Sequence, residues 1–568
     1  MGGEHTIHTA MRLAQTLLVW VLLGISALGQ AAPIHFRNAN QELGIPLPGQ
    51  QTPEMKYIVQ QMAGGVALFD CDNDGRLDLA VITPSTLAGY RAGGNPMVAL
   101  YHQGADGKFT DITEAAGLTR KGWGMGLAVA DYDNDGLLDL YVTGYGGNVL
   151  YRNLGNCKFE DVTERAGVRG SGFSTGAAWG DYDRDGHVDL FVSRYIHTDV
   201  QTLGEIKTNY KGLNVEAPWG MSGETDLLFH NRGDGTFEEV GKKAGVNDPE
   251  GRLGLGVVWG DYDNDGWPDL FVANDTEPNY LYHNQRDGTF KDMALLSGAA
   301  VSAEGKALGS MGVDFGDFDN DGKLDITVST FAYQGNSLFH NAGDEFTDMT
   351  WTSQIGQPTF RWVKWGTGFA DFDNDGFPDI MVAAGHIYTA IDTLPGEPAF
   401  RQPMLVFHNT GQMKFDDVSS TSGVNDQPLQ SRRGVAYGDI NNDGKIDAVV
   451  FNVYGPPSIL INDTKTANHA VLFKLVGTAS NHAAIGARIS LTAGGKSQMA
   501  EVKGGNSYIS QSDLRAHFGL GPETKISKVE IRWPNGKTEE LKDIAADAIY
   551  TVVEGSGVKE TKPFSKTR

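Results

Sequence analysis

Short apolar runs alternate with acidic turns along most of the chain. Residues 140–143 (Leu-Tyr-Val-Thr) and 149–151 (Val-Leu-Tyr) are typical, rich in branched and aromatic side chains and bounded by Asp, Asn and Gly. Runs of this kind predict β-strands rather than helices. The repeating order is strand, acidic loop, strand, variable loop, strand, hairpin, strand. We therefore predict an all-β fold of four-stranded units, as in the blades of a β-propeller.

The acidic loops repeat the pattern Asp-x-Asp-x-Asp-Gly-x-x-Asp seven times, with Asn441 as the one substitution at an acidic position. Carboxylates at positions 1, 3, 5 and 9 and the carbonyl at position 7 are oxygen ligands suited to Ca²⁺, and Gly at position 6 allows the sharp turn. We predict up to seven bound Ca²⁺. The expected ligands are, loop by loop, Asp70, Asp72, Asp74, Arg76 and Asp78; Asp131, Asp133, Asp135, Leu137 and Asp139; Asp181, Asp183, Asp185, His187 and Asp189; Asp261, Asp263, Asp265, Trp267 and Asp269; Asp317, Asp319, Asp321, Lys323 and Asp325; Asp371, Asp373, Asp375, Phe377 and Asp379; and Asp439, Asn441, Asp443, Lys445 and Asp447.

These loops differ from EF-hands at position 12. An EF-hand has a bidentate Glu there and lies between two helices. Here position 12 is always Val, inside an apolar run, so the loops should join strands and the Asp at position 9 should be the fourth carboxylate. A single loop of this kind is often only an acidic hairpin tip. Sevenfold repetition favours the calcium interpretation.

A second motif interleaves with the loops and indicates how the ring closes. It consists of Phe, seven residues and Gly, as in Phe109 to Gly117. The first copy precedes the first acidic loop and no copy follows the last loop. The segment 34–38 should therefore form the outer strand of the seventh blade, so that residues 33–463 make a closed seven-bladed propeller without open sheet edges.

The two rims of such a propeller should differ. All seven acidic loops should lie on one face, and the variable second turns should lie on the other. These turns are longest in blade 3 (residues 195–225) and in blade 6 (residues 386–403). Insertions on one face of a repeat protein are frequent binding sites. Two interpretations stay open: the long turns hold a protein or glycan ligand, or they only cap the central channel.

Charge narrows the choice of partners. The formal net charge is −25, and the loops hold 27 carboxylates, which is seven times four less Asn441. Seven bound dications would change the net charge from −25 to −11. An acidic surface argues against nucleic acid and anionic membrane as partners.

The N-terminus has the pattern of a secretory signal. Arg12 precedes an apolar run at residues 17–28, and small residues follow it. We expect residues 1–32 to be a signal peptide and the protein to be secreted, periplasmic or on the cell surface. The run is short for a membrane span, which favours cleavage over an uncleaved anchor and leaves no span in the mature chain. Met1 and Met11 are alternative starts.

Export permits a disulfide between the two cysteines, Cys71 and Cys157. Two inert thiols are the alternative, because nothing in the sequence brings these residues together.

The repeat stops after Asp463. The strand-like runs that follow predict a small β-sandwich-like domain over residues 464–555. The last residues, 556–568, are polar and are expected to be a disordered tail.

Two resemblances follow from these motifs. Across residues 33–463, the Phe/Gly segments followed by Asp-x-Asp-x-Asp-Gly loops resemble the FG-GAP or VCBS repeats of integrin α-subunit propellers. The stretches 504–511 (Gly-Gly-Asn-Ser-Tyr-Ile-Ser-Gln), 517–521 (His-Phe-Gly-Leu-Gly) and 533–536 (Trp-Pro-Asn-Gly) resemble the ASPIC/UnbV domain. The combination is similar to the cartilage acidic protein family and its bacterial relatives. The resemblance implies a cell-adhesion or interaction role and adds no catalytic chemistry.

Two common catalytic templates are absent. The chain has no His-Glu-x-x-His and no Walker loop. The His residues are scattered, and of these His386 and His517 are the catalytic candidates, with structural hydrogen bonding as the alternative. The loop carboxylates are expected to be committed to metal, with low pKa values that make poor general acids.

We therefore expect an exported calcium-binding interaction module without catalytic or cofactor-binding residues. The alternative is a propeller enzyme of the lyase or dehydratase type that acts on carbohydrate, with its site on the variable face or in the central channel. A quinone-dependent dehydrogenase is disfavoured because the repeated Trp pattern of those propellers is absent. The sequence does not indicate an oligomeric state.

Overall fold

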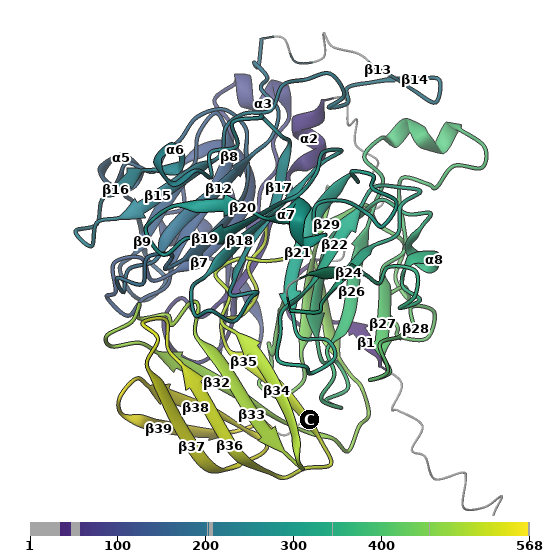
Figure 1. Ribbon diagram of the computed structural model, residues 1–568. Helices are drawn as coiled ribbons and strands as arrows, with labels where there is room; N and C mark the ends of the chain where they lie inside the picture. Colours follow the sequence, from purple (N-terminus) through teal and green to yellow (C-terminus); the bar gives the residue numbers. More distant parts are fainter. Residues whose placement is uncertain are drawn as a thin grey trace, which may run out of the picture.

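The computed structural model describes residues 34–46, 57–201, 203, 208–343, 345–453 and 455–565. The expected signal peptide lies outside these residues. The described chain is built almost entirely of β-sheets, arranged as a large ring with a smaller body beneath it (Figure 1). None of the helices in the described ranges is long and apolar enough to cross a membrane.

Seven four-stranded sheets form the ring, and we number them as blades 1 to 7 in chain order. Blade 2 carries an additional short strand, β4 (Asn95–Pro96). The strands, from the centre outward, are β2 (Val66–Phe69), β3 (Asp78–Ile82), β5 (Val98–Gln103) and β6 (Phe109–Asp111); β7 (Lys121–Ala130), β8 (Asp139–Tyr145), β9 (Val149–Asn153) and β10 (Phe159–Asp161); β11 (Ser174–Gly180), β12 (Asp189–Arg194), β15 (Leu227–Asn231) and β16 (Phe237–Glu239); β17 (Gly254–Gly260), β18 (Asp269–Asn274), β19 (Tyr280–Asn284) and β20 (Phe290–Asp292); β21 (Ser310–Gly316), β22 (Asp325–Thr330), β23 (Ser337–Asn341) and β24 (Phe346–Asp348); β25 (Lys364–Ala370), β26 (Asp379–Ala384), β27 (Leu405–Asn409) and β28 (Phe415–Asp417); and β29 (Arg432–Gly438), β30 (Asp447–Asn452), β31 (Ser458–Asn462) and β1 (Phe36–Asn38).

The ring is closed. Each inner strand packs on the inner strand of the next blade, and β29 of blade 7 packs on β2 of blade 1. Blade 7 combines the two ends of the repeat region, because β1 pairs antiparallel with β31 and Phe36 lies opposite Asn462. This pairing leaves no blade with an unfinished outer edge. The predicted all-β propeller is confirmed.

The Phe/Gly motif has a local explanation. Phe109 begins the outer strand β6, and the short helix α4 follows it. Gly117 ends that helix with φ +86°, a left-handed conformation that glycine adopts without steric cost. The fixed spacing from Phe to Gly is thus the length of one outer strand plus one capped helical turn.

The helices are short and lie between strands. A two-stranded hairpin, β13 (Thr208–Tyr210) and β14 (Leu213–Val215), stands in the long second turn of blade 3. The described helices are α2 (Ile58–Met62), α3 (Leu87–Arg91), α4 (Thr113–Ala116), α5 (Thr163–Ala166), α6 (Gly241–Ala244), α7 (Ala294–Ser297), α8 (Gly356–Thr359) and the 3₁₀ helix η1 (Thr389–Thr393).

The C-terminal part consists of two further four-stranded sheets that share one core, which includes Phe473, Leu491 and Ile531. One sheet has the order β35 (Ala516–Gly521), β32 (His469–Val476), β38 (Ala548–Val553), β39 (Gly557–Pro563), and the other β34 (Lys496–Glu501), β33 (Arg488–Ala493), β36 (Lys525–Arg532), β37 (Thr538–Ala545).

The prediction of a disordered tail at 556–568 was wrong for most of that segment. Residues 557–563 form β39, which pairs antiparallel with β38, and the Ser565 N–H donates to the Asn442 carbonyl at 2.6 Å. The side chains of this strand are mostly exposed along a sheet edge, which is compatible with their polar character. Backbone hydrogen bonds to β38, rather than apolar side chains, hold it in place.

Candidate functional site

Each acidic loop is shaped by its first aspartate. In blade 2, Asp131 accepts hydrogen bonds from the N–H groups of Asp135 at 3.0 Å and Gly136 at 2.8 Å. The same two bonds occur in all seven loops. Gly136 has φ +91°, which explains why position 6 is always Gly. The backbone therefore wraps around the position 1 carboxylate.

The position 9 aspartate ties the loop to the third strand of its blade. Asp139 is fully buried, and its two oxygens accept from Asn153 N at 2.7 Å and Tyr132 N at 3.1 Å. Val142, at position 12, lies inside strand β8. The loops therefore connect strands, as predicted from the missing position 12 Glu.

The position 3 aspartates show that the residues fit a cation. In blades 1 to 3 the Oδ1 atoms of Asp72, Asp133 and Asp183 are buried and have no hydrogen-bond partner among the residues that the structure describes. Burying a carboxylate oxygen without a donor is costly. A hard divalent cation in the loop would satisfy these oxygens, and carboxylate and carbonyl oxygens are the donor set that Ca²⁺ takes.

The position 7 residues differ in their side chains, so only their main-chain atoms are common to all seven loops. Their side chains include Arg, Leu, His, Trp, Lys and Phe, which is consistent with a carbonyl ligand. Their N–H groups donate to the position 5 carboxylate, as in Leu137 to Asp135 at 3.0 Å. Where position 7 is Lys or Arg, its side chain also contacts that carboxylate, as Lys445 does with Asp443 at 2.7 Å.

Burial dominates the electrostatics of several loop carboxylates. Burial, reinforced by the neighbouring carboxylates, raises the pKa of Asp181 to about 8. Burial is also the main cause that raises the pKa of Asp317 to about 7 and that of Asp439 to about 7. The expectation of low pKa values applies to carboxylates that bind a cation and stays a prediction, because a bound cation lowers a carboxyl pKa whereas desolvation raises it. Crowded buried carboxylates of this kind favour a bound cation.

The third strand adds a basic residue beside most loops, which the sequence analysis missed. In blade 4, His283 Nδ1 lies 3.2 Å from Asp269 and 3.4 Å from Asp263. Equivalent positions hold His102, Arg152, His230, His340 and His408. The His residues are therefore less scattered than they appear in sequence. In the sequence, these positions are marked by a His or Arg one residue before the final Asn or Gln of the third strand.

Hydrogen bonds join most neighbouring loops around the ring. The side-chain amide of Asn73, at position 4, donates to the Gly136 carbonyl of the next loop at 2.8 Å. Five other loops make the same bond with Asn. Blade 3 has Arg184 at this position, and its Nε donates to the Pro534 carbonyl of the C-terminal sheets at 3.0 Å. One hydrogen bond of this kind therefore holds each loop to the next at six of the seven junctions.

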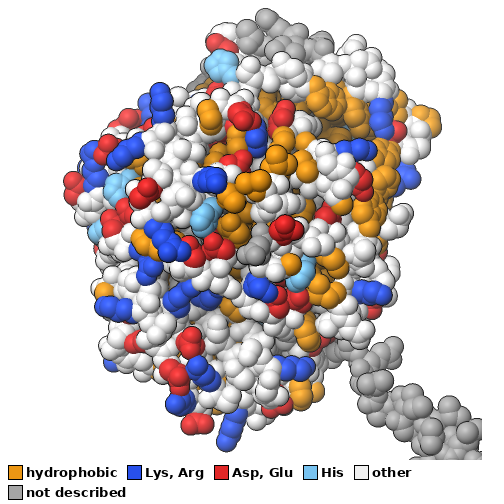
Figure 2. Space-filling view, in the orientation of Figure 1, with side chains coloured by type: hydrophobic (Ala, Val, Ile, Leu, Met, Phe, Trp, Pro, Cys, Tyr) orange, Lys and Arg blue, Asp and Glu red, His pale blue; other side chains and the backbone are white. Residues whose placement is uncertain are grey.

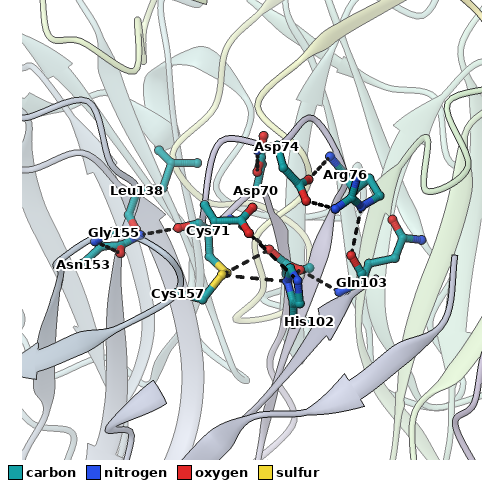
Figure 3. Close-up of a disulfide and its surroundings, with 12 residues drawn as sticks. Asp70, Cys71, Asp74, Arg76, His102, Gln103, Leu138, Asn153, Gly155 and Cys157 are labelled. Carbon is teal, nitrogen blue, oxygen red and sulfur yellow. Dashed lines mark hydrogen bonds and ion pairs between the residues drawn. A yellow bond between two sulfur atoms is a disulfide. The ribbon is translucent and has the colours of Figure 1, made fainter. Parts of the chain in front are cut away.

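The two cysteines form a disulfide next to the first loop (Figure 3). Cys71 is at position 2 of the blade 1 loop, and Cys157 is in the turn between β9 and β10 of blade 2, with 5.1 Å between their Cα atoms. The Asn153 side-chain amide also donates to the Cys71 carbonyl at 2.8 Å. Of the two open interpretations, the structure has the paired one, and the bond joins adjacent blades.

The C-terminal sheets cover the loop face. The Arg515 guanidinium donates to the Asp439 carbonyl at 2.9 Å and to Asn442 at 2.6 Å, both in the blade 7 loop. The His482 N–H donates to Asn134 in the blade 2 loop at 2.7 Å. The loops therefore face a second domain rather than open solvent.

The segment 504–511 of that domain enters the central channel. Ser507 exchanges two backbone hydrogen bonds with Val313 of blade 5, at 2.8 and 2.9 Å. The Leu127 N–H of blade 2 donates to the Ile509 carbonyl at 3.0 Å, and the buried Tyr508 hydroxyl donates to the Met62 carbonyl at 2.8 Å. This motif of the C-terminal domain acts as a plug that hydrogen-bonds to several inner strands.

The long turns of blades 3 and 6 meet on the opposite face. Tyr210 and Tyr388 have ring centroids 5.4 Å apart, and Lys211 Nζ lies 2.7 Å from a Glu397 oxygen. Between the turns and the inner strands is a cavity of about 170 Å³. In the view of Figure 2, hydrophobic side chains gather over the propeller, whereas the C-terminal sheets present mainly polar and charged groups. The turns therefore both cap the channel and border a cavity.

The two catalytic candidates are buried. His386 accepts from Tyr388 N at 3.1 Å, its Nε2 has no hydrogen-bond partner, and burial lowers its pKa to about 3. His517 Nε2 lies 3.3 Å from the Gly444 carbonyl, and burial lowers its pKa to about 4. His517 thus belongs to the contact between the C-terminal sheets and the blade 7 loop. In the described part of the chain, neither residue forms a hydrogen bond or ion pair with a carboxylate that would make it a base at neutral pH.

Comparison with known families agrees with this architecture. An FG-GAP-like repeat matches residues 70–142, 131–192, 219–272 and 261–328, and the ASPIC and UnbV family matches residues 477–559.

Among individual proteins, cartilage acidic protein 1 of Homo sapiens is 25% identical over 341 residues, which are 58% of this chain and 40% of that protein. The chain thus spans less than half the length of this relative. Among solved structures, an Agrocybe aegerita lectin described as recognising non-reducing terminal N-acetylglucosamine is 16% identical, with a TM-score of 0.37 over 69% of this chain and 87% of that one. YCF48 bound to a D1 peptide is 7% identical, with a TM-score of 0.38, and the match covers 78% of this chain and 99% of that one.

The repeated loops, the closed ring of sheets and the C-terminal motifs lead to one assignment. The chain carries FG-GAP-like repeats in an all-β propeller and a C-terminal ASPIC and UnbV domain, and over 58% of its length it is similar to cartilage acidic protein 1.

Proposed function

We propose that this protein is an exported calcium-binding propeller that acts as a protein or glycan interaction module, in which calcium is structural. The buried position 3 oxygens without donors support this proposal most directly. They recur at equivalent places in several loops, together with carboxylates at positions 1, 5 and 9. Seven such sites at the joints between strands and neighbouring loops would stabilise the ring.

The ligand is expected on the face with the long turns of blades 3 and 6. The loop face is covered by the C-terminal sheets, so a partner would have to displace them to reach it. The opposite face has the exposed Trp219 and the largest departures from the repeat. Aromatic residues next to a cavity are frequent anchors for ligands.

The calcium proposal is tested by thermal unfolding with and without chelation, with metal analysis to confirm removal. At about ten times the dissociation constant each site contributes ~1.4 kcal/mol, so seven additive sites give ~10 kcal/mol. Chelation should lower the melting temperature sharply. Asp133→Asn should remove about one site's share of the calcium-dependent shift, and Asp106→Asn, outside the loops, should leave it unchanged. An unchanged melt after proven metal removal would contradict the structural role.

Export has a separate test. N-terminal sequencing of the protein recovered from the periplasm or medium should show a mature chain that starts near residue 33. Recovery of the full-length precursor in the cytoplasm alone would contradict export, without bearing on calcium binding.

A further inference from the structure

The cavity on the variable face is built from several parts of the chain. It has a volume of about 170 Å³ and lies between helix α2, the long turns of blades 3 and 6, and the inner ends of several blades. A cavity of roughly 150 Å³ holds one benzene ring. The space therefore suits one substituted six-membered ring rather than a large cofactor.

One polar side chain in this cavity lacks partners. Gln61, on helix α2, lines the cavity and is 1% exposed. Within the described residues, neither its Nε2 nor its Oε1 has a hydrogen-bond partner. A buried amide normally makes bonds with both groups, so this one presents an unused donor and an unused acceptor to the cavity.

A carboxyl group lines the same cavity. Asp275 is 8% exposed, and its Oδ2 accepts from the Tyr195 hydroxyl at 2.5 Å. Within the described residues it forms no ion pair. Asp275 therefore offers a fixed, oriented hydrogen-bonding group that no neighbouring cation neutralises.

Aromatic rings supply the rest of the wall. Trp365, Phe331 and Tyr388 are among the lining residues, and Trp219 stands at the rim with 42% of its surface exposed. Trp219 stacks on Tyr210 with 5.8 Å between ring centroids, which holds it in place. Flat apolar faces beside oriented polar groups are typical of small-ligand pockets.

We propose that this cavity binds a single neutral sugar residue, either free or at the end of a glycan. A pyranose ring has apolar faces that stack on aromatic rings and vicinal hydroxyls that both donate and accept. The hydroxyls would satisfy the Gln61 amide and the Asp275 carboxyl together. An alkylammonium ion would pair with Asp275 but leave the Gln61 amide donor facing a cation, and a hydrocarbon would satisfy neither. This inference rests on the proposed ligand role of the variable face.

The first test uses the full chain loaded with calcium and a panel of neutral monosaccharides, followed by tryptophan fluorescence and calorimetry. At least one sugar should bind. Trp219→Ala should weaken that binding by roughly tenfold or more, since it removes a stacking surface. The matched control is Trp351→Ala, because Trp351 is similarly exposed at 46% and does not line the cavity. Binding that survives Trp219→Ala undiminished would overturn the proposal.

The second test uses Gln61→Met, which keeps the volume and removes the unpartnered amide. We expect a higher melting temperature without sugar, because a buried polar group without partners is removed, and a loss of sugar binding of roughly tenfold. This pair of opposite effects would not result from a purely structural residue. Failure of every sugar in the panel to bind at millimolar concentration would also overturn the proposal.

A glycan array probed with wild type and Trp219→Ala distinguishes a free sugar from a glycan as the ligand. Spots that lose signal in Trp219→Ala identify a terminal residue as the source, and binding in calorimetry alone identifies the free sugar. The chelation experiment is independent of both. Loss of sugar binding with an intact calcium effect would refute only this inference, whereas an absent calcium effect would refute the proposed function of the loops.

Discussion

The two faces of the propeller are built by different means. The loop face repeats one arrangement seven times, with the same hydrogen bonds around each position 1 aspartate. The opposite face has an unrepeated cavity, bordered by helix α2, the long turns of blades 3 and 6 and the inner ends of several blades. Repetition suits a stabilising role, because each loop joins a blade to the next. A unique arrangement suits recognition, because specificity needs asymmetry.

The plug formed by residues 504–511 links the two faces. Its Tyr508 is fully buried, contacts Trp365 with 4.8 Å between ring centroids, and so reaches from the loop face to the wall of the cavity. The C-terminal domain thus covers the loops and also supports the opposite face.

Removing the plug side chain should be the most damaging single change. Tyr508→Ala deletes a buried aromatic ring in the channel, and such deletions cost about 3–5 kcal/mol. Tyr508→Phe is the control, since it keeps the ring and loses only the hydrogen bond to the Met62 carbonyl, worth about 1 kcal/mol. Chemical denaturation measures both. Equal losses in the two variants would show that the ring does not fill the channel.

Opening the disulfide should affect only the joint between blades 1 and 2. The bond closes a loop with a sequence separation of 86 residues, and such bonds stabilise by about 2–4 kcal/mol. Reduction of wild type should lower the melting temperature, and Cys71→Ser should show the same lowered value with no further response to reductant. A wild-type melt that is insensitive to reductant, with free thiols confirmed by titration, would contradict the structural role of this bond.

The loop face should also respond to pH once metal is removed. Burial raises the pKa of Asp181 to about 8 and that of Asp317 to about 7, against about 4 in an unfolded chain. The folded state then binds more protons than the unfolded state between these values, so stability rises as the pH falls from about 8 to about 6.

The melting temperature of metal-stripped protein measures this trend. Saturating calcium should weaken it, because the bound cation keeps the carboxylates ionised. If the melting temperature of metal-stripped protein falls as the pH is lowered from about 8 to about 6, the raised pKa values of Asp181 and Asp317 are contradicted.

Periodicity explains what the sequence could predict. Asp131 and its six equivalents identified the loops, Val142 at position 12 placed them between strands, and the unpaired Phe motif at Phe36 indicated closure by the N-terminal segment. These features depend on local spacing repeated many times. The third-strand His residues obey the same period and could have been found by aligning the repeats.

The remaining features depend on contacts between distant, unrepeated segments. The pairing of Cys71 with Cys157, the entry of Tyr508 into the channel and the position of Gln61 in the cavity have no sequence period. The tail was mispredicted for a similar reason, since β39 is held by backbone bonds to β38 rather than by apolar side chains. Composition alone carries no information about such bonds.

The smallest predicted effect concerns the blade 7 loop. Asn441 replaces the position 3 carboxylate, and its Oδ1 accepts from Asp443 N at 3.1 Å. This site should be the weakest of the seven, because it has one negative charge fewer. Asn441→Asp should tighten calcium binding there, with Asn425→Asp outside the loops as the control. A calcium titration in which the blade 7 site of wild type fills first would contradict this order.

The most direct test of the central claim is anomalous scattering from crystals grown with calcium. The account predicts one anomalous peak inside each acidic loop, bounded by the carboxylates of positions 1, 3, 5 and 9, with the weakest peak in blade 7. Loops without peaks at saturating calcium, in crystals whose metal content has been measured, would contradict the claim that these repeated aspartates are a set of calcium sites.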